Sequence, residues 1–498
     1  MKILIVVNNP DRWPLEIPNV ELVSARAYLT DPSNSERRGV RVFNLCRSYA
    51  YQSLGYYVSL LAEARGHKPQ PSVETIQGMK SQATLRLFSD EISELMAQAF
   101  AQVKSDEYVL SIYFGRPLAK RNERLALALF NQYQAPLLRA RFRRDEEGTW
   151  NLVGLRPIPA NEVPESHRPT LVDAAERYFH GKRFTPRRSR SLRFDLAMLV
   201  EPDEAHPPSN EGALKRFEAA AHRAGLEVER ITRDDYARLS EFDALFIRTT
   251  TAVDHYTYRF ATRAAASGLV VIDDPPSIVR AANKVFLAEV LGRHGVPIPR
   301  TEIVHRGNVG EIQQRLGLPC VLKKPDSAFS QGVVKVSTPE QLADKLEELL
   351  EQSELVVAQS FVPTEYDWRV GVFDGQPLYA CRYYMAPGHW QIMKHEGGDT
   401  DYGKVETLAV EEAPRGVIRA AVKAADLIGD GLYGVDLKQH GREVVVIEVN
   451  DNPNIDAGFE DRVLKNELYD VIMEGFLARI EARKAPHRRR GRRLGGVR

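Results

Sequence analysis

The chain has 498 residues, too many for one ordinary hydrophobic core, so we expect two or three domains. Hydrophobic residues make up 43% and charged residues 27%, which excludes a disordered or fibrous chain, and a net charge of +1 gives no overall attraction to nucleic acid or membranes. Cys46, Cys320 and Cys381 lack metal-site spacing and cannot form a disulfide framework, which predicts a reduced, cytoplasmic setting. No apolar run reaches the length of a signal-peptide core or a membrane span, so we expect no membrane partner.

The first domain is expected over residues 1–190. Its apolar patterns predict strands at 3–7, 108–114 and 138–144 and helices at 44–64 and 90–104. Residues 181–193 are rich in basic side chains and contain one interleaved aromatic residue, Phe184. This composition favours an exposed linker over a nucleic-acid patch.

A second domain is expected over residues 194–283, where strands and helices alternate. The predicted strands are 194–200, 226–231, 244–248 and 270–273, and the predicted helices are 211–224 and 256–266. Gly225 stands where a helix C-cap belongs, and Pro275-Pro276 is expected to stop the last strand. Short connections between alternating elements predict a small parallel sheet covered by helices.

A third domain is expected over residues 284–480, so the fold class of the whole chain is α/β. Helices are predicted at 284–295, 339–352 and 415–428, and strands at 320–323, 333–336, 355–359, 369–373, 378–384, 434–438 and 443–450. Asp374-Gly375 predicts a tight hairpin turn. Residues 481–498, whose last part is arginine- and glycine-rich, are predicted to be a disordered basic tail; contact with an acidic partner is the alternative.

The last predicted hairpin carries an acidic cluster. Asp436 lies on one strand, and Glu448 and Asn450 lie two residues apart on the next, so all three side chains should face the same side. Their apolar neighbours should pack on the other face; these are Val435, Leu437, Ile447 and Val449. Clustered oxygen ligands favour Mg²⁺ or Mn²⁺ over zinc. A solvent-facing strand with ordinary polar residues is the alternative, although the polar turn at 451–454 favours a site.

Two lysines and a small-residue loop suggest a phosphate-binding region. Lys323 ends an apolar strand and Lys284 opens a helix, where a cation opposes the helix dipole; either could instead be an ordinary surface lysine. The loop after Lys323 ends in Ser330-Gln331-Gly332 and could cover phosphates. Backbone and apolar groups at the next strand end could hold adenine; they belong to Gln359, Ser360, Phe361 and Val362. Neither a Walker loop nor a dinucleotide glycine fingerprint is present.

In this order and spacing, residues 195–480 resemble the RimK-like ligases of the ATP-grasp superfamily. The resemblance implies an α+β ATP-grasp fold in which a small parallel pre-ATP-grasp domain precedes two α+β subdomains. It adds Asp367, as an ATP-binding residue, and Arg369 from an Asp-x-Arg pattern, and Arg382 at a position that reaches phosphates or the acyl group. Ser360 stands where these enzymes usually carry an acidic residue, and Lys394 is expected to replace the charge of an arginine that is missing from 394–398. The first block resembles the N-terminal extension of certain RimK-like proteins and gives no activity by itself.

The activity that the resemblance implies is ATP-dependent ligation of a carboxylate to an amine through an acylphosphate. ATP and Mg²⁺ (or Mn²⁺) are the expected cofactors, with Arg369, Arg382 and Lys394 as catalytic residues. The substrates would be a small-molecule acid and amine or a peptide or protein, with glutamate as the family's usual amino acid. Relatives are commonly dimers or tetramers, so a homo-oligomer is an expectation of the resemblance.

Three alternatives remain open at this point. A phosphotransferase of the same fold would leave a stable phosphorylated product, whereas a ligase releases phosphate only when an amine is present. A non-catalytic scaffold would bind ATP tightly without hydrolysing it. Binding of nucleic acid or an acidic protein through the tail would depend on salt and disappear when residues 486–498 are deleted.

Overall fold

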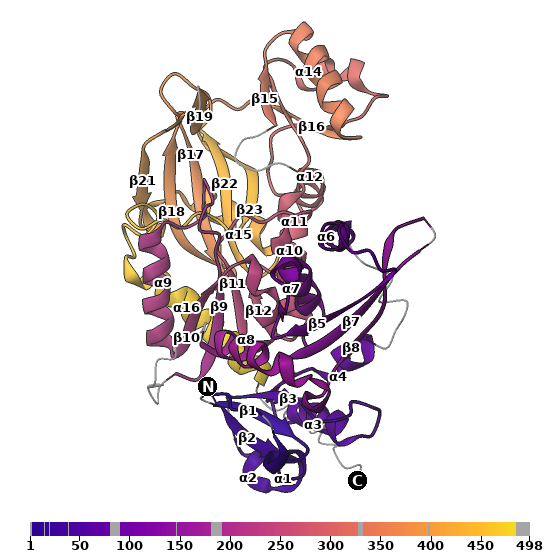
Figure 1. Ribbon diagram of the computed structural model, residues 1–498. Coiled ribbons are helices and arrows are strands. Elements are labelled where there is room, and N and C mark those ends of the chain that lie inside the picture. Colours follow the sequence, from indigo (N-terminus) through magenta and orange to yellow (C-terminus); the bar gives the residue numbers. More distant parts are fainter. Residues whose placement is uncertain are drawn as a thin grey trace, which may run out of the picture. The chain divides into compact units, whose positions relative to one another are not determined.

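The computed structural model describes residues 2–79, 90–180, 192–326, 332–396 and 399–484, except for positions 14, 19, 38 and 146. It divides into two compact units (Figure 1). The N-terminal unit comprises Met1–Arg193 and Asp234–Glu241, and the C-terminal unit comprises Phe194–Arg233 and Phe242–Arg498. In the described part of the chain, no helix is long and apolar enough to cross a membrane.

The N-terminal unit contains a parallel and an antiparallel sheet of four strands each. The parallel sheet has the order β2-β1-β3-β4 and is built from β1 (Lys2–Val7), β2 (Glu21–Ser24), β3 (Val40–Asn44) and β4 (Lys68–Gln70). The antiparallel sheet has the order β6-β5-β7-β8 and is built from β5 (Glu107–Tyr113), β6 (Arg116–Pro117), β7 (Leu137–Arg144) and β8 (Trp150–Pro157).

Helices bury the apolar faces of both sheets. They are α1 (Ala25–Thr30), α2 (Pro32–Ser35), α3 (Leu54–Ala64), α4 (Val73–Gly78), α6 (Asp90–Phe100), α7 (Glu123–Gln132) and α8 (Arg168–His180). Alternate residues of β1 enter two cores, because side chains alternate along a strand. Leu4 and Val6 pack with Val58 of α3, whereas Ile3 and Ile5 pack with Leu171 of α8.

The predicted helix over residues 44–64 is only half correct. The chain continues as β3 to Asn44, and helix α3 begins at Leu54 after a loop. Ser53 caps the helix by accepting a hydrogen bond from the backbone N–H of Tyr56. The loop lies so close to the helix that a Cβ at Gly55 would stand 2.3 Å from the carbonyl oxygen of Ser48. Apolar periodicity alone did not reveal this cap.

Residues 234–241 belong to the N-terminal unit although they connect two strands of the C-terminal unit. They form a 3-10 helix, Arg233–Glu241, whose Ala237 packs in the core of the antiparallel sheet. Glu241 is buried, forms an ion pair with buried Arg41 and accepts a hydrogen bond from the hydroxyl of Tyr178 at 2.6 Å. The domain boundaries expected from sequence did not include this exchange.

The first part of the C-terminal unit is the parallel sheet that the sequence predicts, in the order β10-β9-β11-β12. Its elements are β9 (Phe194–Leu199), α9 (Glu211–Ala224), β10 (Leu226–Ile231), β11 (Ala244–Ile247), α10 (Tyr256–Ala266) and β12 (Val270–Ile272). Gly225 ends α9 with φ +86°, as expected of a left-handed cap. Pro275-Pro276 does more than stop β12: it opens helix α11 (Pro275–Ala282), since proline suits the first helical turn.

Two antiparallel sheets follow (Figure 1). The smaller, in the order β13-β16-β14-β15, consists of β13 (Thr301–Val304), β14 (Cys320–Lys323), β15 (Val333–Val336) and β16 (Val356–Ser360), with α12 (Lys284–Arg293), α13 (Ile312–Leu316) and α14 (Pro339–Gln352). The larger, in the order β21-β18-β17-β22-β23, consists of β17 (Tyr366–Phe373), β18 (Gln376–Tyr384), β21 (Val405–Leu408), β22 (Leu432–His440) and β23 (Glu443–Asp451). Strands β19 (Met393–Glu396) and β20 (Asp399–Tyr402) form a separate pair.

One face of the larger sheet packs against α15 (Arg415–Asp426). Trp368, Val370 and Leu437 lie on this face with Val417 of the helix, all buried. Asp374 and Gly375 both have positive φ, which gives the predicted tight turn between β17 and β18. The opposite face of the sheet is therefore left for polar side chains over part of its area.

The last helix, α16 (Asn466–Lys484), was not predicted. Its buried residues recur at helical spacing and pack with α9, for example Tyr469 against Phe217. The prediction that the disordered tail begins at residue 481 is wrong for residues 481–484, which are helical. Residues 485–498 and 181–191 lie outside the described part, so the tail and linker stay predictions.

Candidate functional site

The hairpin β22–β23 has the register expected from sequence. Asp436 lies opposite Glu448, and Gly434 lies opposite Asn450, so the three oxygen-bearing side chains share one face. One detail differs: a β-bulge places Val446 opposite Leu437 and makes Ile447 the extra residue. Val446 joins the buried core beside α15. Ile447, which was predicted to pack there, does not. The bulge keeps Glu448 in line with Asp436.

Asp436 is held from two sides. Arg369 on the neighbouring strand β17 donates from Nε at 2.7 Å and from Nη2 at 2.8 Å, one bond to each carboxylate oxygen. Asn450 donates its amide N–H to Asp436 Oδ2 at 3.1 Å. Burial lowers the pKa of Arg369, but the carboxylate of Asp436 raises it more, so this pKa stands well above its ordinary value. The guanidinium group therefore remains charged.

Glu448 faces two buried lysines. The Nζ atom of Lys284 lies 3.0 Å from Glu448 Oε1, and both Lys284 and Lys323 are only 7% exposed. Burial raises the pKa of Glu448, but Lys284 and Lys323 outweigh it, so the pKa is lowered overall. Burial lowers the pKa of Lys323 to about 8, against the attraction of Glu448. The predicted lysines thus lie beside the predicted acidic hairpin.

The N-terminus of α12 is joined to the segment after β14, which fixes both lysines. Asn283 caps the helix by accepting from the N–H of Phe286, and its side-chain amide donates to Asp326 Oδ1 at 2.8 Å. The backbone N–H of Lys284 donates to the carbonyl oxygen of Pro325 at 2.9 Å. A lysine at this helix start, which sequence analysis marked as unfavourable, is compensated by Glu448.

A narrow pocket, with a volume of only about 10 Å³, adjoins the two lysines. Its walls are mostly apolar and include Leu287, Ile298, Val357 and Ile447, and Gln359 contributes an amide. Gln359 donates to Thr301 Oγ1 at 3.0 Å, which orients its carbonyl. The lining, apolar with two cations at one end, matches a flat base linked to phosphates in its chemistry, and the pocket would have to widen to admit one. The bulged Ile447 forms part of it.

In the segment predicted to hold adenine, the backbone N–H groups of Ser360 and Phe361 are already hydrogen-bonded within the protein. The backbone N–H of Ser360 donates to Arg300 O at 2.9 Å, and that of Phe361 donates to Pro319 O at 3.3 Å. Base recognition at these two residues would therefore fall to carbonyl oxygens and the ring of Phe361. The ammonium group of Lys335 lies 4.0 Å from the centre of that ring.

Asp367 lies on the same sheet face as Arg369, two residues away along β17. Its Oδ1 atom contacts Lys438 Nζ at 2.5 Å and accepts from Thr364 Oγ1 at 3.0 Å. The pKa of Asp367 is raised overall, because the effect of burial outweighs the opposite effect of Lys438. Sequence reasoning missed Lys438, although its position two residues after Asp436 on one strand was a usable signal.

Arg382 lies on the other face of the sheet. Its strand partner is Trp368, and its guanidinium group lies 4.9 Å from the Trp368 ring centre and pairs with Glu406 at 3.3 Å. Because Trp368 is in the core against α15, Arg382 points away from Asp436 and Glu448. The structure therefore does not bring Arg382 into the site, contrary to expectation.

Four other predicted residues lie at or beyond the limits of the described part of the chain. Ser330 and Gln331 fall outside the described residues, as does the side chain of Lys394. Gly332 has φ +69°, and its carbonyl oxygen accepts the N–H of Lys324 at 3.0 Å. A side chain at this glycine would meet Lys324, so the loop ends in a tight turn.

The chain after β23 is anchored to the small parallel sheet. Buried Arg248, which follows β11, donates to Asn452 Oδ1 at 2.7 Å and to Pro453 O at 2.9 Å. Asp273, which follows β12, accepts from the N–H of Asn452 at 2.6 Å. Sequence analysis missed Arg248 and Asp273, although both stand at carboxyl ends of parallel strands, where sites commonly form.

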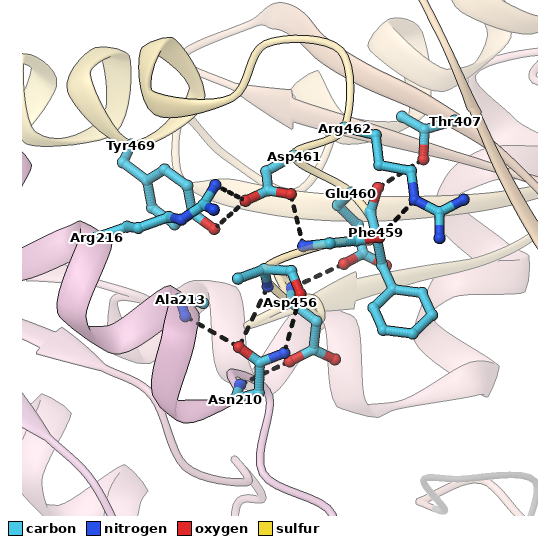
Figure 2. A network of polar contacts seen from close by, with 12 residues as sticks. Asn210, Ala213, Arg216, Thr407, Asp456, Phe459, Glu460, Asp461, Arg462 and Tyr469 are labelled. Atoms are coloured by element: carbon cyan, nitrogen blue, oxygen red, sulfur yellow. Dashed lines mark hydrogen bonds and ion pairs between the residues drawn. The ribbon is translucent and has the colours of Figure 1, made fainter.

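Figure 2 shows how the next residues are held between helices α9 and α16. Asp456 accepts from the N–H of Asn210 at 2.6 Å, and Asp461 binds Arg216 of α9 at 2.5 Å and the hydroxyl of Tyr469 of α16 at 2.9 Å. Thr407 of β21 donates to Phe459 O at 2.7 Å. The loop is thereby fixed at several points, and with it the end of the acidic hairpin.

The donor set fits a magnesium ion in its chemistry. Asp436, Glu448 and Asn450 offer only oxygen ligands, and the amide N–H of Asn450 is turned to Asp436, which leaves its carbonyl oxygen for a cation. No group of three or more His, Cys, Asp or Glu side chains that could hold a metal occurs among the residues described, so the amide oxygen would be needed as the third ligand.

Two family models match the chain. Residues 25–174 match the RimK-like ATPgrasp N-terminal domain, and residues 281–470 match the RimK-like ATP-grasp domain.

Similar proteins include a "Probable alpha-L-glutamate ligase" of Teredinibacter turnerae, 27% identical over 53% of this chain and 84% of that protein. A protein of the same name from Syntrophotalea carbinolica is 26% identical over 47% of this chain and 76% of that protein. Among solved structures, D-alanine–D-alanine ligase from Bacillus anthracis with ATP aligns over 59% of this chain and 99% of that chain, at 17% identity and a TM-score of 0.45. The two family models, in this order along the sequence, identify the chain as a RimK-like ATP-grasp ligase with an additional N-terminal domain.

Proposed function

We propose that the protein joins a carboxylate to an amine at the expense of ATP, with its reaction centre on the β17–β22–β23 face. The observation that carries this proposal is the alternation of charges there. Arg369 pairs with Asp436, and Lys284 pairs with Glu448, while Lys323 lies buried beside them. Such a set costs free energy in an isolated protein and is useful where several anions must meet.

The residues divide into two roles. Asp436, Glu448 and Asn450 would hold Mg²⁺, and Lys284 and Lys323 would move from Glu448 toward the phosphates when nucleotide binds. The substrate carboxylate would take the γ-phosphoryl group of ATP and release ADP, giving an acylphosphate. The amine nitrogen would then attack the acyl carbon and displace inorganic phosphate, which leaves the amide. Arg369 remains charged and would stabilise negative charge that develops beside Asp436. The apolar slot around Ile298 and Val357 would take the base.

The amine substrate is proposed to be an amino acid such as glutamate, because the similar curated proteins carry the name alpha-L-glutamate ligase. The acid would be a small molecule or the carboxyl group of a peptide or protein. Cytoplasmic placement and oligomeric state stay predictions from the sequence.

The direct test is ADP release from ATP in the presence of glutamate and a panel of amino acids and short peptides, with mass spectrometry of the products. Release that requires both an acid and an amine, with a product heavier by an amide-linked residue, supports the ligase. A stable phosphorylated product would instead show a phosphotransferase. Glu448→Gln should lower the rate by about 10²–10³-fold, whereas Glu443→Gln, at the exposed start of β23 in the same hairpin, should leave it unchanged.

A further inference from the structure

The parallel sheet of the N-terminal unit has a topological switch point. The chain passes from β1 to β2 on one side and later reaches β3 on the other side of β1, which gives the order β2-β1-β3-β4. In parallel sheets, ligands bind outside the carboxyl ends of the strands where the strand order reverses. Here that place lies between the ends of β1 and β3, at Asn8 and the residues after Asn44.

A pocket of about 250 Å³ opens at this carboxyl edge. Arg47, Ser48 and Tyr49 line it from the end of β3, and Ile76 and Met79 line it from α4 and the residue after it. The end of β8 and the residues after it supply further walls, including Leu155, Arg156, Pro157 and Glu162. The strand topology and the pocket thus indicate the same location within one unit.

The charge in and around this pocket is positive. Arg156 and Arg139 both bind the one carboxylate of Glu162, Arg156 at 2.6 Å and Arg139 at 3.4 Å. The hydrogen bond from Arg156 lowers the pKa of Glu162 most, and the charge of Arg139 lowers it further, so Glu162 stays ionised. Arg47 is exposed, and no hydrogen bond or ion pair joins its guanidinium group to another residue of the described chain. The excess charge suits an anionic ligand.

The loop that carries Arg47 is fixed before any ligand binds. The N–H of Arg47 donates to Asn8 Oδ1 at 2.6 Å, which ties the ends of β3 and β1 together. Ser53 Oγ donates to Ser48 O at 2.9 Å, and the buried hydroxyl of Tyr49 donates to Asn44 O at 2.7 Å. A fixed loop loses little conformational freedom on binding, which favours recognition of a small molecule.

We propose that this pocket binds a small carboxylic acid with an apolar body, and that Arg47 is the group that pairs with the carboxylate. Guanidinium and carboxylate groups match in geometry and charge. Ile76, Met79, Leu155 and Pro157 would contact the apolar body. The site is separate from the acidic hairpin and does not depend on the catalytic proposal.

Isothermal titration calorimetry of the full-length protein tests the proposal. The probes are N-acetyl-L-leucine and N-acetyl-L-phenylalanine, and the uncharged matched controls are the corresponding amides. We expect saturable binding of at least one acid and at least tenfold weaker binding of its amide. Arg47→Gln should weaken binding of the acid about tenfold or more, because a charged hydrogen bond is lost.

Two further variants locate the binding. Arg26→Gln removes an exposed arginine of helix α1 that does not line the pocket and should bind like the wild type. Glu448→Gln should also bind the acid normally, even though its rate of ADP release is expected to fall strongly. Binding that survives Arg47→Gln unchanged, binding that is lost in Glu448→Gln, or no binding of either acid would each overturn the proposal.

Discussion

The two parallel sheets of the molecule have the same strand order but use their carboxyl edges differently. In the sheet β10-β9-β11-β12, the chain itself fills the edge, since buried Arg248 and Asp273 bind Asn452 after the acidic hairpin. In the sheet β2-β1-β3-β4, the edge opens onto a pocket with exposed Arg47. One topology thus serves as an anchor for a neighbouring site in one unit and as a pocket in the other.

Removing Arg248, which anchors the chain after β23 to the sheet β10-β9-β11-β12, should have the largest effect on stability. Arg248→Met leaves Asn452, Ser209 and two carbonyl oxygens without their buried donor. Since each unsatisfied buried group costs about 1–3 kcal/mol, we expect a loss of about 4 kcal/mol or more in the C-terminal unit. Hydrogen exchange of β9 and β11, followed by mass spectrometry, measures it. Unchanged protection of these strands would show that the edge is not held by this side chain.

The effect of a substitution on the rate of ADP release should depend strongly on which face of the larger antiparallel sheet the residue occupies. Arg369→Met removes the bidentate partner of Asp436 and should lower the rate of ADP release by about 10²–10³-fold. Arg382→Met, from the opposite face, is the matched comparison and should change the rate by less than about 3-fold, since a surface ion pair contributes little. Equal losses in the two variants would contradict the assignment of faces.

Asn452, which connects Arg248 to the end of the β22–β23 hairpin, offers a milder substitution. Asn452→Ala keeps the backbone but removes the acceptor of Arg248 and the donor to Thr249 O, at a residue whose φ is +46°. We expect a loss of about 2 kcal/mol in unfolding free energy, combining lost hydrogen bonds with backbone strain. Urea denaturation monitored in the C-terminal unit checks this value. Asn452→Asp, which keeps an acceptor, should lose less.

The N-terminal sheet should respond to pH through His67, next to β4. Burial lowers the pKa of His67, whose ring contacts the hydroxyl of Tyr28 at 2.7 Å. The unfolded chain takes up this proton near pH 6.5, whereas the folded unit takes it up only at lower pH, so stability falls as the pH drops below about 6.5. Thermal unfolding of the N-terminal unit between pH 5 and 8 should show this slope. His67→Gln should reduce it, and the exposed-site variant His294→Gln should not.

The smallest effect on stability is expected at the open edge. Arg47→Gln changes an exposed side chain that has no polar partner in the described chain, so the unfolding free energy should change by less than about 0.5 kcal/mol. Chemical denaturation beside Arg248→Met gives the contrast directly. A loss comparable to that of Arg248→Met would mean that the two edges are built alike.

Local patterns predicted what depends on neighbouring residues in sequence. Alternation along β22 and β23 was enough to place Asp436, Glu448 and Asn450 on one face, and periodicity gave α9 and α10 with their observed bounds. Register across strands could not be predicted in this way. The face of Arg382 follows from its pairing with Trp368, and the bulge at Ile447 follows from tertiary packing. The roles of Arg248 and Asp273 depend on residues some 200 positions away.

The eight residues that return to the N-terminal unit have a consequence for how the protein can be divided. Ala237 completes the core of the antiparallel sheet in that unit. Glu241 neutralises the charge of Arg41, which is buried beside it. A truncated protein that ends at Arg193 would lack both, so a charged guanidinium group would remain enclosed without its counter-ion. Exchange of N-terminal units between relatives would therefore have to transfer Asp234–Glu241 as well, as a second, non-contiguous piece.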